Sequence, residues 1–467
     1  MVKVLFIYPP ISFGKRGALS AYCPPLGILY LATILKELGH EVHVIDVEAE
    51  GLSLAELIQR VRSINPEVVG LTCLTYTLDS CRKIIKEVKK VTNAYVAVGG
   101  PHVSVVRENS LQELGADLCV IGEAEAVIGE IVEKKPKGVL YAEEIQDIDS
   151  IPFPDHGLIQ HLKYGAFYGL RFGEKVTGIL TTRGCKYGCT YCNRPKKLSF
   201  RARSPENLLE ELKELDRMGF DTIWLADDNF TNDPKNVIKL AKLIKREKLK
   251  FHFYGQARVD VPSRALYKAM REMGVMGLSY GVESLNPKII RWYNKTPHPE
   301  KWPRYVEKTL KLCDEYKIVF LGSLIFGAPM ETKEDMEYSI EFLYKNGADI
   351  INGNILLYLV GSPIWYWAVR EGKIRPNQYM VSAPEAGLTP YSHEELQDMC
   401  IYCTNLSKGE GWKRIFRKML ERRELGLIFS STRQFIKNYP LVRKVRKEVL
   451  RYGYGKETNL HIKAGAP

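Results

Sequence analysis

The chain has 467 residues, of which 45% are hydrophobic, 10% aromatic and 26% charged. This composition is typical of a globular protein of two or three domains, and it excludes a mostly disordered or fibrous chain. The formal net charge of +12 is uneven, because residues 408–451 hold 14 Lys and Arg against four Asp and Glu. The remainder is nearly neutral, which argues against a nucleic-acid partner bound across the fold.

Neither a membrane span nor a signal peptide is predicted. The longest apolar run, Ile318–Met330, has 13 residues, whereas a helix needs roughly 18–20 to cross a bilayer. Near the N-terminus, Val4–Tyr8 is too short for a signal-peptide core and predicts a buried strand. We therefore expect a cytoplasmic protein, in which ten cysteines favour metal or redox chemistry over a disulfide framework.

Residues 1–135 predict a doubly wound α/β domain. Short apolar runs alternate with amphipathic helical patterns, an order that gives a parallel sheet with helices on both faces. The predicted strands are Val4–Tyr8, Glu41–Asp46, Val68–Leu74, Ala94–Val98 and Asp117–Gly122, and the predicted helices are Leu26–Leu38, Leu54–Ser63, Ser80–Val91 and Asn109–Leu114. Ligands of such sheets bind beyond the carboxyl ends of the strands. The residues at or just beyond those ends include Pro10, Thr72, Gly99, Gly100, His102, Gly122 and Glu123.

Residues 136–170 are mostly polar and predict a linker, in which Ile151-Pro152-Phe153-Pro154 imposes an extended path. A second alternation over 171–375 predicts a partial (β/α)6 barrel, with function at the carboxyl ends of its strands. The predicted strands are Val176–Thr182, Thr222–Ala226, His252–Gln256, Gly277–Val282, Val319–Phe326 and Ile350–Tyr358, and the helical patterns between them include Asn207–Met218, Val237–Glu247, Arg264–Met273 and Glu334–Lys345.

Three cysteines follow the first predicted barrel strand. Cys185, Cys189 and Cys192 are separated by three and two residues, a spacing at which three thiolates can wrap a loop around three corners of a 4Fe–4S cluster. The fourth iron then has no protein ligand and is free to bind a substrate or cofactor. A structural zinc site would need a fourth Cys or His nearby, and none follows within the next dozen residues.

This Cys-x-x-x-Cys-x-x-Cys motif resembles that of the radical S-adenosylmethionine (SAM) enzymes, and the resemblance extends through the TIM-type barrel. Pro24-Pro25-Leu26-Gly27, Gly39-His40-Glu41, Val98-Gly99-Gly100-Pro101-His102 and Ile121-Gly122-Glu123 resemble the Rossmann-like cobalamin-binding domain that precedes some of these barrels. The resemblance implies three cofactors, namely a 4Fe–4S cluster, SAM and cobalamin, and an external electron donor of the flavodoxin or ferredoxin type. A 5′-deoxyadenosyl radical formed from SAM would abstract hydrogen from an unactivated carbon.

The resemblance also assigns contacts to the nucleoside of SAM. Tyr191, in the slot before the third cysteine, would lie over the adenine. Glu283 and Ser284 match the ribose-binding segment, and Gly327 begins a Gly-x-Pro-x-Glu-Thr segment near the adenine. Helix capping or simple packing is the alternative role for each of these residues.

The methionyl end of SAM is assigned less directly. Arg258 would grip the methionyl carboxylate or a substrate anion. Where many family members have a Gly-Gly-Glu that holds the amino group, this chain has Asp227-Asp228. Either Asp227 or Asp228 is therefore a candidate for that contact.

By the same resemblance, the residues at the strand ends of the first domain would contact cobalamin. The chain lacks Asp-x-His-x-x-Gly, the motif whose histidine ligates cobalt from below, and His40, His43 and His102 lie in other contexts. The lower axial position is therefore expected to be empty or water-filled. The alternative is a vestigial domain that only packs against the barrel, and a structural role explains His102 equally well.

Residues 376–467 predict a small, basic helical region. An apolar stripe at helical spacing faces a basic side, and 441–449 repeats the pattern; the stripe is Trp412, Ile415, Phe416, Met419 and Leu420, and the basic side is Lys413, Arg414, Arg417, Lys418, Arg422 and Arg423. Two interpretations of this amphipathic pattern are equally supported by the sequence. Either the helices contact an anionic membrane surface peripherally, on its inner face, or the stripe packs on the barrel. Cys400 and Cys403 are predicted to be buried thiols rather than ligands of a second cluster.

The sequence thus predicts a cobalamin-dependent radical SAM enzyme, with C-methylation of a small molecule or a membrane lipid as the first choice. Radical ring closure or carbon–carbon coupling on a lipid or tetrapyrrole is the main alternative. A methylthiotransferase would need three further cluster cysteines, and Cys119 lies inside an apolar strand. A non-enzymatic cobalamin carrier would need no SAM-cleaving motif. No residue is assigned a catalytic role.

Overall fold

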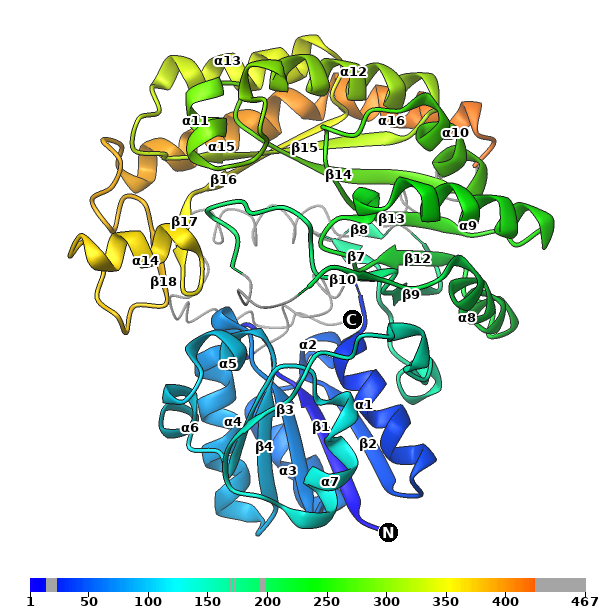
Figure 1. Ribbon diagram of the computed structural model, residues 1–467, viewed down its shortest axis with the longest axis vertical. Helices are drawn as coiled ribbons and strands as arrows, with labels where there is room; N and C mark the ends of the chain where they lie inside the picture. Colours follow the sequence, from blue (N-terminus) through cyan, green and yellow to red (C-terminus); the bar gives the residue numbers. More distant parts are fainter. Residues whose placement is uncertain (14–22, 168–169, 172, 194–198, 425–467) are drawn as a thin grey trace, which may run out of the picture.

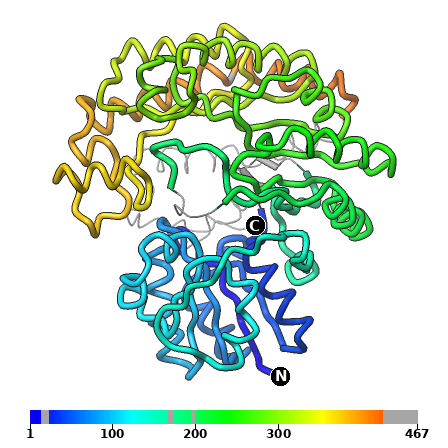
Figure 2. Tube along the Cα trace, in the orientation of Figure 1, coloured from blue at the N-terminus to red at the C-terminus, as the bar shows by residue number. Residues whose placement is uncertain are grey.

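The computed structural model describes residues 1–13, 23–167, 170–171, 173–193 and 199–424. Two α/β bodies lie one above the other, the first domain below in blue and cyan and the barrel above in green to orange (Figure 1). The Cα trace shows that each body is built from a largely continuous part of the chain (Figure 2). The fold class predicted from the sequence is therefore confirmed.

A parallel sheet of six strands in the order β2-β1-β3-β4-β5-β6 forms the centre of the first domain. The strands are β1 (Lys3–Tyr8), β2 (Glu41–Asp46), β3 (Val68–Thr72), β4 (Tyr95–Gly99), β5 (Leu118–Ile121) and β6 (Gly138–Tyr141). All five predicted strands are present. The edge strand β6 lies within the segment predicted to be a linker and was not predicted; three of its residues are partly buried and Tyr141 is exposed.

Helices cover both faces of this sheet. They are α1 (Leu26–Glu37), α2 (Val47–Glu50), α3 (Leu54–Ile64), α4 (Leu78–Val91), α5 (Pro101–Val106), α6 (Asn109–Leu114) and α7 (Ile128–Lys134). Because side chains alternate along a strand, Leu5 and Ile7 of β1 pack in one core with α3 and α4. Val4 and Phe6 pack on the other face with α1 and α7.

The barrel sheet is also parallel and six-stranded, in the order β16-β15-β14-β13-β12-β9. Its strands are β9 (Val176–Ile179), β12 (Thr222–Leu225), β13 (His252–Ala257), β14 (Val275–Glu283), β15 (Val319–Phe326) and β16 (Ile350–Ile355). The strands β9 and β16 form the two edges, so that the barrel is open. The predicted sixth strand is interrupted at Leu356, after which a short strand β17 (Leu357–Leu359) pairs with β18 (Met380–Ser382).

The outer layer of the barrel consists of helices, as Figure 1 shows. They are α8 (Pro205–Arg217), α9 (Pro234–Arg246), α10 (Arg264–Met273), α11 (Pro287–Trp292), α12 (Trp302–Glu315) and α13 (Lys333–Lys345), and α14 (Pro363–Arg370) lies beside β17 and β18. The four predicted helices are confirmed, whereas α12 was not predicted. Residue pairs β10 (Thr182–Arg183) and β11 (Arg201–Ala202) form an antiparallel ladder beside the barrel, and β7 (Ala166–Phe167) and β8 (Leu170–Arg171) form another.

Two further helices, α15 (His393–Lys408) and α16 (Glu410–Glu421), pack against the barrel. Helix α15 lies against the edge strand β16. Cys400 and Cys403 of α15 are buried in the barrel core, as predicted, and burial raises the pKa of the Cys400 thiol to about 12. No helix in the described part of the chain has the length and apolar character that a membrane span requires.

Helix α16 docks through its basic side chains, which neither interpretation of the amphipathic pattern anticipated. Lys418 is almost fully buried, and its Nζ donates to Asp349 Oδ2 at 2.6 Å and to the Ile318 carbonyl at 3.0 Å. Arg422 donates to the Val275 carbonyl at 2.6 Å. These acceptors lie at the starts of barrel strands, where buried oxygens need donors. Part of the apolar stripe stays outside: Phe416 is 49% exposed. The repeat at 441–449 lies outside the described residues.

Candidate functional site

The carboxyl-end edge of the first-domain sheet faces the barrel. At one end of this edge, Glu123 after β5 bonds to Arg201 of β11. Beside the neighbouring strand β4, Gly361 approaches α5 closely: its φ is 89°, and a Cβ there would lie 2.3 Å from a methyl group of Val105. The edge at which a doubly wound sheet holds its ligand therefore opens towards the barrel.

The cysteine loop lies between these bodies, because it connects β10 to β11. Gly184 begins the loop with φ at 76°, and a Cβ there would lie 2.6 Å from the Ser199 carbonyl oxygen. Cys185 is half-buried, Cys189 is buried and Cys192 is exposed, and none of the three forms a disulfide. Arg258 Nη1 lies 3.5 Å from Cys189 Sγ.

The donor set of this loop fits an iron–sulfur cluster. Cys thiolates are the usual protein ligands of such a cluster, and the loop supplies three of them, which a cluster would distribute over three different irons. The described residues hold no group of three or more His, Cys, Asp or Glu side chains gathered around one ion position. The sequence-predicted Cys185, Cys189 and Cys192 would hold the cluster.

A segment after α11 holds the cysteine loop from the barrel side, and the sequence analysis missed it. The Thr190 amide donates to the Tyr293 carbonyl at 2.9 Å, and the Thr190 hydroxyl donates to the Trp292 carbonyl at 3.0 Å. Asn294 Nδ2 donates to the Gly188 carbonyl at 2.9 Å. Asn294 has a left-handed backbone with φ at 49°, a conformation that Asn tolerates better than most residues. The Asn, followed by Pro297 and Pro299, is a local signal that could have suggested a turn here.

Tyr191 and Glu283, which the resemblance assigns to the nucleoside of SAM, lie in contact with each other. The Tyr191 hydroxyl donates to Glu283 Oε1 at 2.8 Å, and Lys295 Nζ lies 2.6 Å from the same oxygen and 2.8 Å from the hydroxyl. Burial, then the Glu283 charge, raises the pKa of Tyr191 well above its usual value. Glu283 has φ at 64°, an uncommon conformation for a residue with a side chain. Lys295 was not predicted.

Asp227 is fully engaged by the chain that precedes the cysteine loop. Its Oδ1 accepts from the amides of Thr181 at 2.9 Å and Thr182 at 2.5 Å, and from the Thr182 hydroxyl at 2.7 Å. Its Oδ2 accepts from the Thr181 hydroxyl at 3.0 Å. Burial raises the pKa of Asp227 to about 6, against these hydrogen bonds, which lower it. Asp228, the other candidate, is exposed.

Arg258 is committed within the chain. It makes two hydrogen bonds to Asp260, at 2.9 and 2.7 Å, donates to the Lys295 carbonyl, and lies 3.6 Å above the centre of the Tyr187 ring. The structure therefore places it beside Cys189, at the cluster, with its fork already paired.

The other two predicted SAM residues lie at turns. The Ser284 hydroxyl is buried and accepts from the Asn286 amide at 3.2 Å. Gly327 has φ at 101°, and its amide donates to Glu331 Oε2 at 2.6 Å. Burial raises the pKa of Glu331 to about 8, although the Gly327 and Ala328 amides lower it.

At the cobalamin edge, Pro10 follows β1 and Thr72 ends β3, on either side of the point where the strand order reverses. Gly99 ends β4. A Cβ on Gly100 would lie 2.6 Å from Thr72 Oγ1, and one on Gly122 would lie 2.1 Å from the Ala142 carbonyl oxygen. The chain's own packing therefore explains Gly100 and Gly122 without a ligand.

His102 is buried, and its ring is oriented by protein groups. Nδ1 lies 3.2 Å from the Thr75 hydroxyl, Nε2 lies 3.6 Å from Glu113, and the edge-to-face ring of Tyr379 lies 5.2 Å away. Burial lowers the pKa of His102. Its contact with Tyr379, just before β18, joins the first domain to the barrel extension, which favours the structural alternative for this residue.

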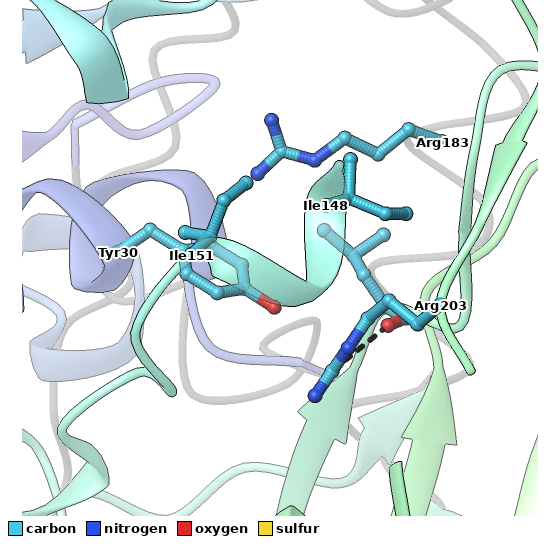
Figure 3. A pocket seen from close by; sticks show the side chains of 6 residues that line it. Tyr30, Ile148, Ile151, Arg183 and Arg203 are labelled. Carbon is cyan, nitrogen blue, oxygen red and sulfur yellow. Dashed lines mark hydrogen bonds between the residues drawn. The ribbon is translucent and has the colours of Figure 1, made fainter. Parts of the chain in front are cut away.

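A small pocket of about 240 Å³, partly open to solvent, lies where α1, the segment before the barrel and the cysteine hairpin meet. Figure 3 shows Tyr30, Arg183 and Arg203 around it, with Arg203 donating to the Leu180 carbonyl at 3.2 Å. Its lining is Tyr30, Ile148, Ile151, Leu180, Arg183 and Arg203. None of the predicted cofactor residues lines it.

Comparisons with known proteins agree with this geometry. Residues 16–132 match the B12 binding domain family, and residues 179–343 match the Radical SAM superfamily. An uncharacterized methyltransferase of Pyrococcus horikoshii is 29% identical over 85% of this chain and 91% of its own length. The anaerobic magnesium-protoporphyrin IX monomethyl ester cyclase of Cereibacter sphaeroides is 26% identical over 75% of this chain and 61% of its own length.

A solved structure shares the fold. It is the radical SAM methyltransferase TsrM of Kitasatospora setae with cobalamin and a [4Fe-4S] cluster bound, with a TM-score of 0.63 at 16% identity, covering 79% of this chain and 76% of its own. The two matched families, in this order along the chain, confirm the expectation of cobalamin, SAM and a 4Fe–4S cluster as cofactors. The chain belongs to the cobalamin-dependent radical SAM enzymes.

Proposed function

We propose that this enzyme methylates an unactivated carbon of a hydrophobic substrate. The observation that carries the proposal is the meeting of three elements: the ligand edge of the B12-binding domain, the cysteine loop and the SAM segments of the barrel. Glu123 of the first contacts Arg201 beside the loop, and Tyr191 of the loop bonds to Glu283 of the barrel. When bound, the cofactors supply the radical chemistry and the methyl group.

The chain's own residues would hold and orient these groups. The three thiolates would bind the cluster, and Arg258 would orient the Cys189 sulfur through their contact at 3.5 Å. Tyr191, Glu283 and Lys295 would present a hydroxyl, a carboxylate and an ammonium group to the nucleoside of SAM. The first domain would cover the barrel face and exclude water from it.

Methylation is favoured over ring closure by the extent of the likeness. The relative described as a methyltransferase aligns with 85% of this chain and 91% of its own length. The cyclase aligns with 61% of its own length. Ring closure or carbon–carbon coupling stays the second candidate, because the same cofactors and the same site would serve it.

The products formed from SAM distinguish the two. We would incubate anaerobically reconstituted protein with hydroxocobalamin, a chemical reductant, SAM labelled with deuterium in its methyl group, and a total lipid extract. S-adenosylhomocysteine together with 5′-deoxyadenosine, and a lipid carrying the labelled methyl group, would support methylation. Deoxyadenosine alone would support ring closure. The Cys189→Ala variant is the control and should form no deoxyadenosine.

We propose further that α16 contacts anionic membrane surfaces. Phe416 and Leu420, one helical turn apart, are 49% and 44% exposed. Lys413, Arg417 and Arg423 are exposed beside them, and such a combination favours an interface rich in anionic headgroups. The wild-type protein should co-sediment with anionic vesicles and not with neutral ones. In the double variant Phe416→Ser, Leu420→Ser this co-sedimentation should weaken, while deoxyadenosine formation persists. Equal sedimentation of wild type and variant would contradict the proposal.

A further inference from the structure

Four charged side chains join the B12-binding domain to the two ends of the cysteine loop. Glu123 and Glu125 follow β5, whereas Arg183 ends β10 and Arg201 begins β11. The Arg201 guanidinium donates from Nη1 and Nη2 to the two oxygens of Glu123, at 2.8 Å each. Arg183 donates to Glu125 Oε1 at 2.5 Å and lies 3.3 Å from Glu123.

These groups are withdrawn from water. The side chains of Arg183, Glu123 and Glu125 are 14%, 11% and 9% exposed, and that of Arg201 is 7% exposed. Burial raises the pKa of Glu123, but the bonds from Arg201 and from the Ile145 amide outweigh it, so that its net shift is downward. A buried ion cluster of this kind adds little net stability, and its contribution is to fix the relative geometry of the groups that it joins.

The pairing uses both oxygens of Glu123. Oε1 accepts from Arg201 and faces Arg183, and Oε2 accepts from Arg201 and from the Ile145 amide at 2.8 Å. The carboxylate was predicted to contact cobalamin. Its contacts are instead with the segment before the barrel and with the hairpin that carries the cluster.

The ion cluster lies where the two ends of the cysteine loop meet the ligand edge of the B12-binding domain. Gly184 to Cys192 lie between Arg183 and Arg201 along the chain, so that both arms of the cysteine loop end on it. Glu123 lies at the carboxyl end of β5, on the edge where the domain holds its ligand. Arg183 also faces the pocket of Figure 3, with its guanidinium 5.5 Å from the centre of the Tyr30 ring.

We propose that Glu123 and Arg201, with Glu125 and Arg183, form an interdomain clamp that positions the cluster loop against the cobalamin edge. Glu123 is then a positioning residue and not a cobalamin ligand. The clamp sets the relative placement of two cofactors that are held by different domains. The inference needs the cofactor assignment but not the methylation reaction, so that the two can fail separately.

The test is a double-mutant cycle on hydroxocobalamin affinity, with Glu123→Gln, Arg201→Gln and the double variant of the full chain. If the two residues act through each other, each single change should raise the Kd by the same factor, about tenfold, and the double change should do no more. If Glu123 contacts cobalamin directly, Arg201→Gln should leave the Kd near that of wild type. That result would overturn the proposal.

Amide hydrogen exchange provides the readout that a general loss of stability would not imitate. In either single variant, exchange should be faster by about tenfold or more at residues 182–185 and 142–146, while β3 and β14 keep their protection. Uniformly faster exchange, or none, would contradict a local clamp. Lys239→Gln, which breaks the exposed Lys239–Glu206 pair between α8 and α9, is the matched control and should change neither Kd nor exchange at the hairpin.

Discussion

Variants of Asp227 can distinguish two roles for this residue that the sequence could not, namely contact with SAM and structural support of the chain before the cysteine loop. In Asp227→Ala the two threonine hydroxyls can turn to other acceptors, but the amides of Thr181 and Thr182 lose theirs in a buried site. An unpartnered buried donor costs about 1–3 kcal/mol. We therefore expect the free energy of unfolding to fall by about 2–6 kcal/mol.

Asp227→Asn should be mild. The amide oxygen can replace Oδ1, which accepts three of the four hydrogen bonds, and the Thr181 hydroxyl can accept from the new NH2 group. Removing a buried charge whose pKa burial raises to about 6 offsets part of the loss. We expect a change of about 1 kcal/mol or less.

Urea unfolding of the apoprotein gives the two free energies, and titration of the reconstituted protein with SAM gives the affinity. Asp228→Asn, an exposed neighbour with the same change in charge, is measured beside them. The supporting role predicts a large loss of stability for Ala alone and near wild-type SAM affinity for Asn. Weaker SAM binding by Asp227→Asn, with Asp227→Ala as stable as wild type, would refute the reasoning.

Four further outcomes are expected. Replacing any of the three motif cysteines by Ala should reduce reconstituted iron from about four per chain and abolish deoxyadenosine formation, whereas Cys400→Ala should not; iron content and chromatography measure this. Cobalt(II) cobalamin bound to the protein should show no nitrogen coupling from a protein imidazole in its electron paramagnetic resonance spectrum. Lys418→Met should lower the free energy of unfolding by about 3–5 kcal/mol, because it leaves the buried Asp349 with only its longer ion pair, 3.9 Å from Arg414, while the exposed Arg417→Met should change it little. Because the pKa of Glu331 is raised in the fold from 4.5 to about 8, the native state binds more protons in that interval, so that stability should fall as pH rises from about 4.5 to 8, at about 1.4 kcal/mol per unit of pKa displacement; Glu331→Gln should flatten this slope in urea midpoints.

The two bodies could be predicted because their signals are local. A strand such as Val319–Phe326 is predicted by its own apolar residues, and the spacing of three cysteines within eight residues predicts the cluster loop. The edge strand β6 escaped prediction although its residues, Gly-Val-Leu-Tyr, are apolar, because it is only four residues long and lies in a highly charged stretch of sequence.

The remaining parts of the site depend on pairings across long stretches of chain. Lys295 meets Tyr191 across 104 residues, and Glu123 meets Arg201 across 78. The hydrophobic periodicity of a sequence carries no information about contacts between residues so far apart. Arg258 shows the opposite case. Its guanidinium is bound by Asp260, only two residues away, so that the competition between Asp260 and the SAM carboxylate for Arg258 could have been inferred from the sequence.

The seating of α16 has a consequence for how the protein matures on the ribosome. The buried carboxylate of Asp349 receives its ammonium partner from Lys418, which is synthesised 69 residues later. At about 5–20 residues per second, the wait is about 3–14 s. During that interval the last barrel strand has an unpaired charge at its start, while the cysteine loop has long since emerged. Cells that load the cluster during synthesis would therefore load it into an incompletely braced barrel, and slowing translation between these two positions should increase the fraction of chains that lose iron or aggregate.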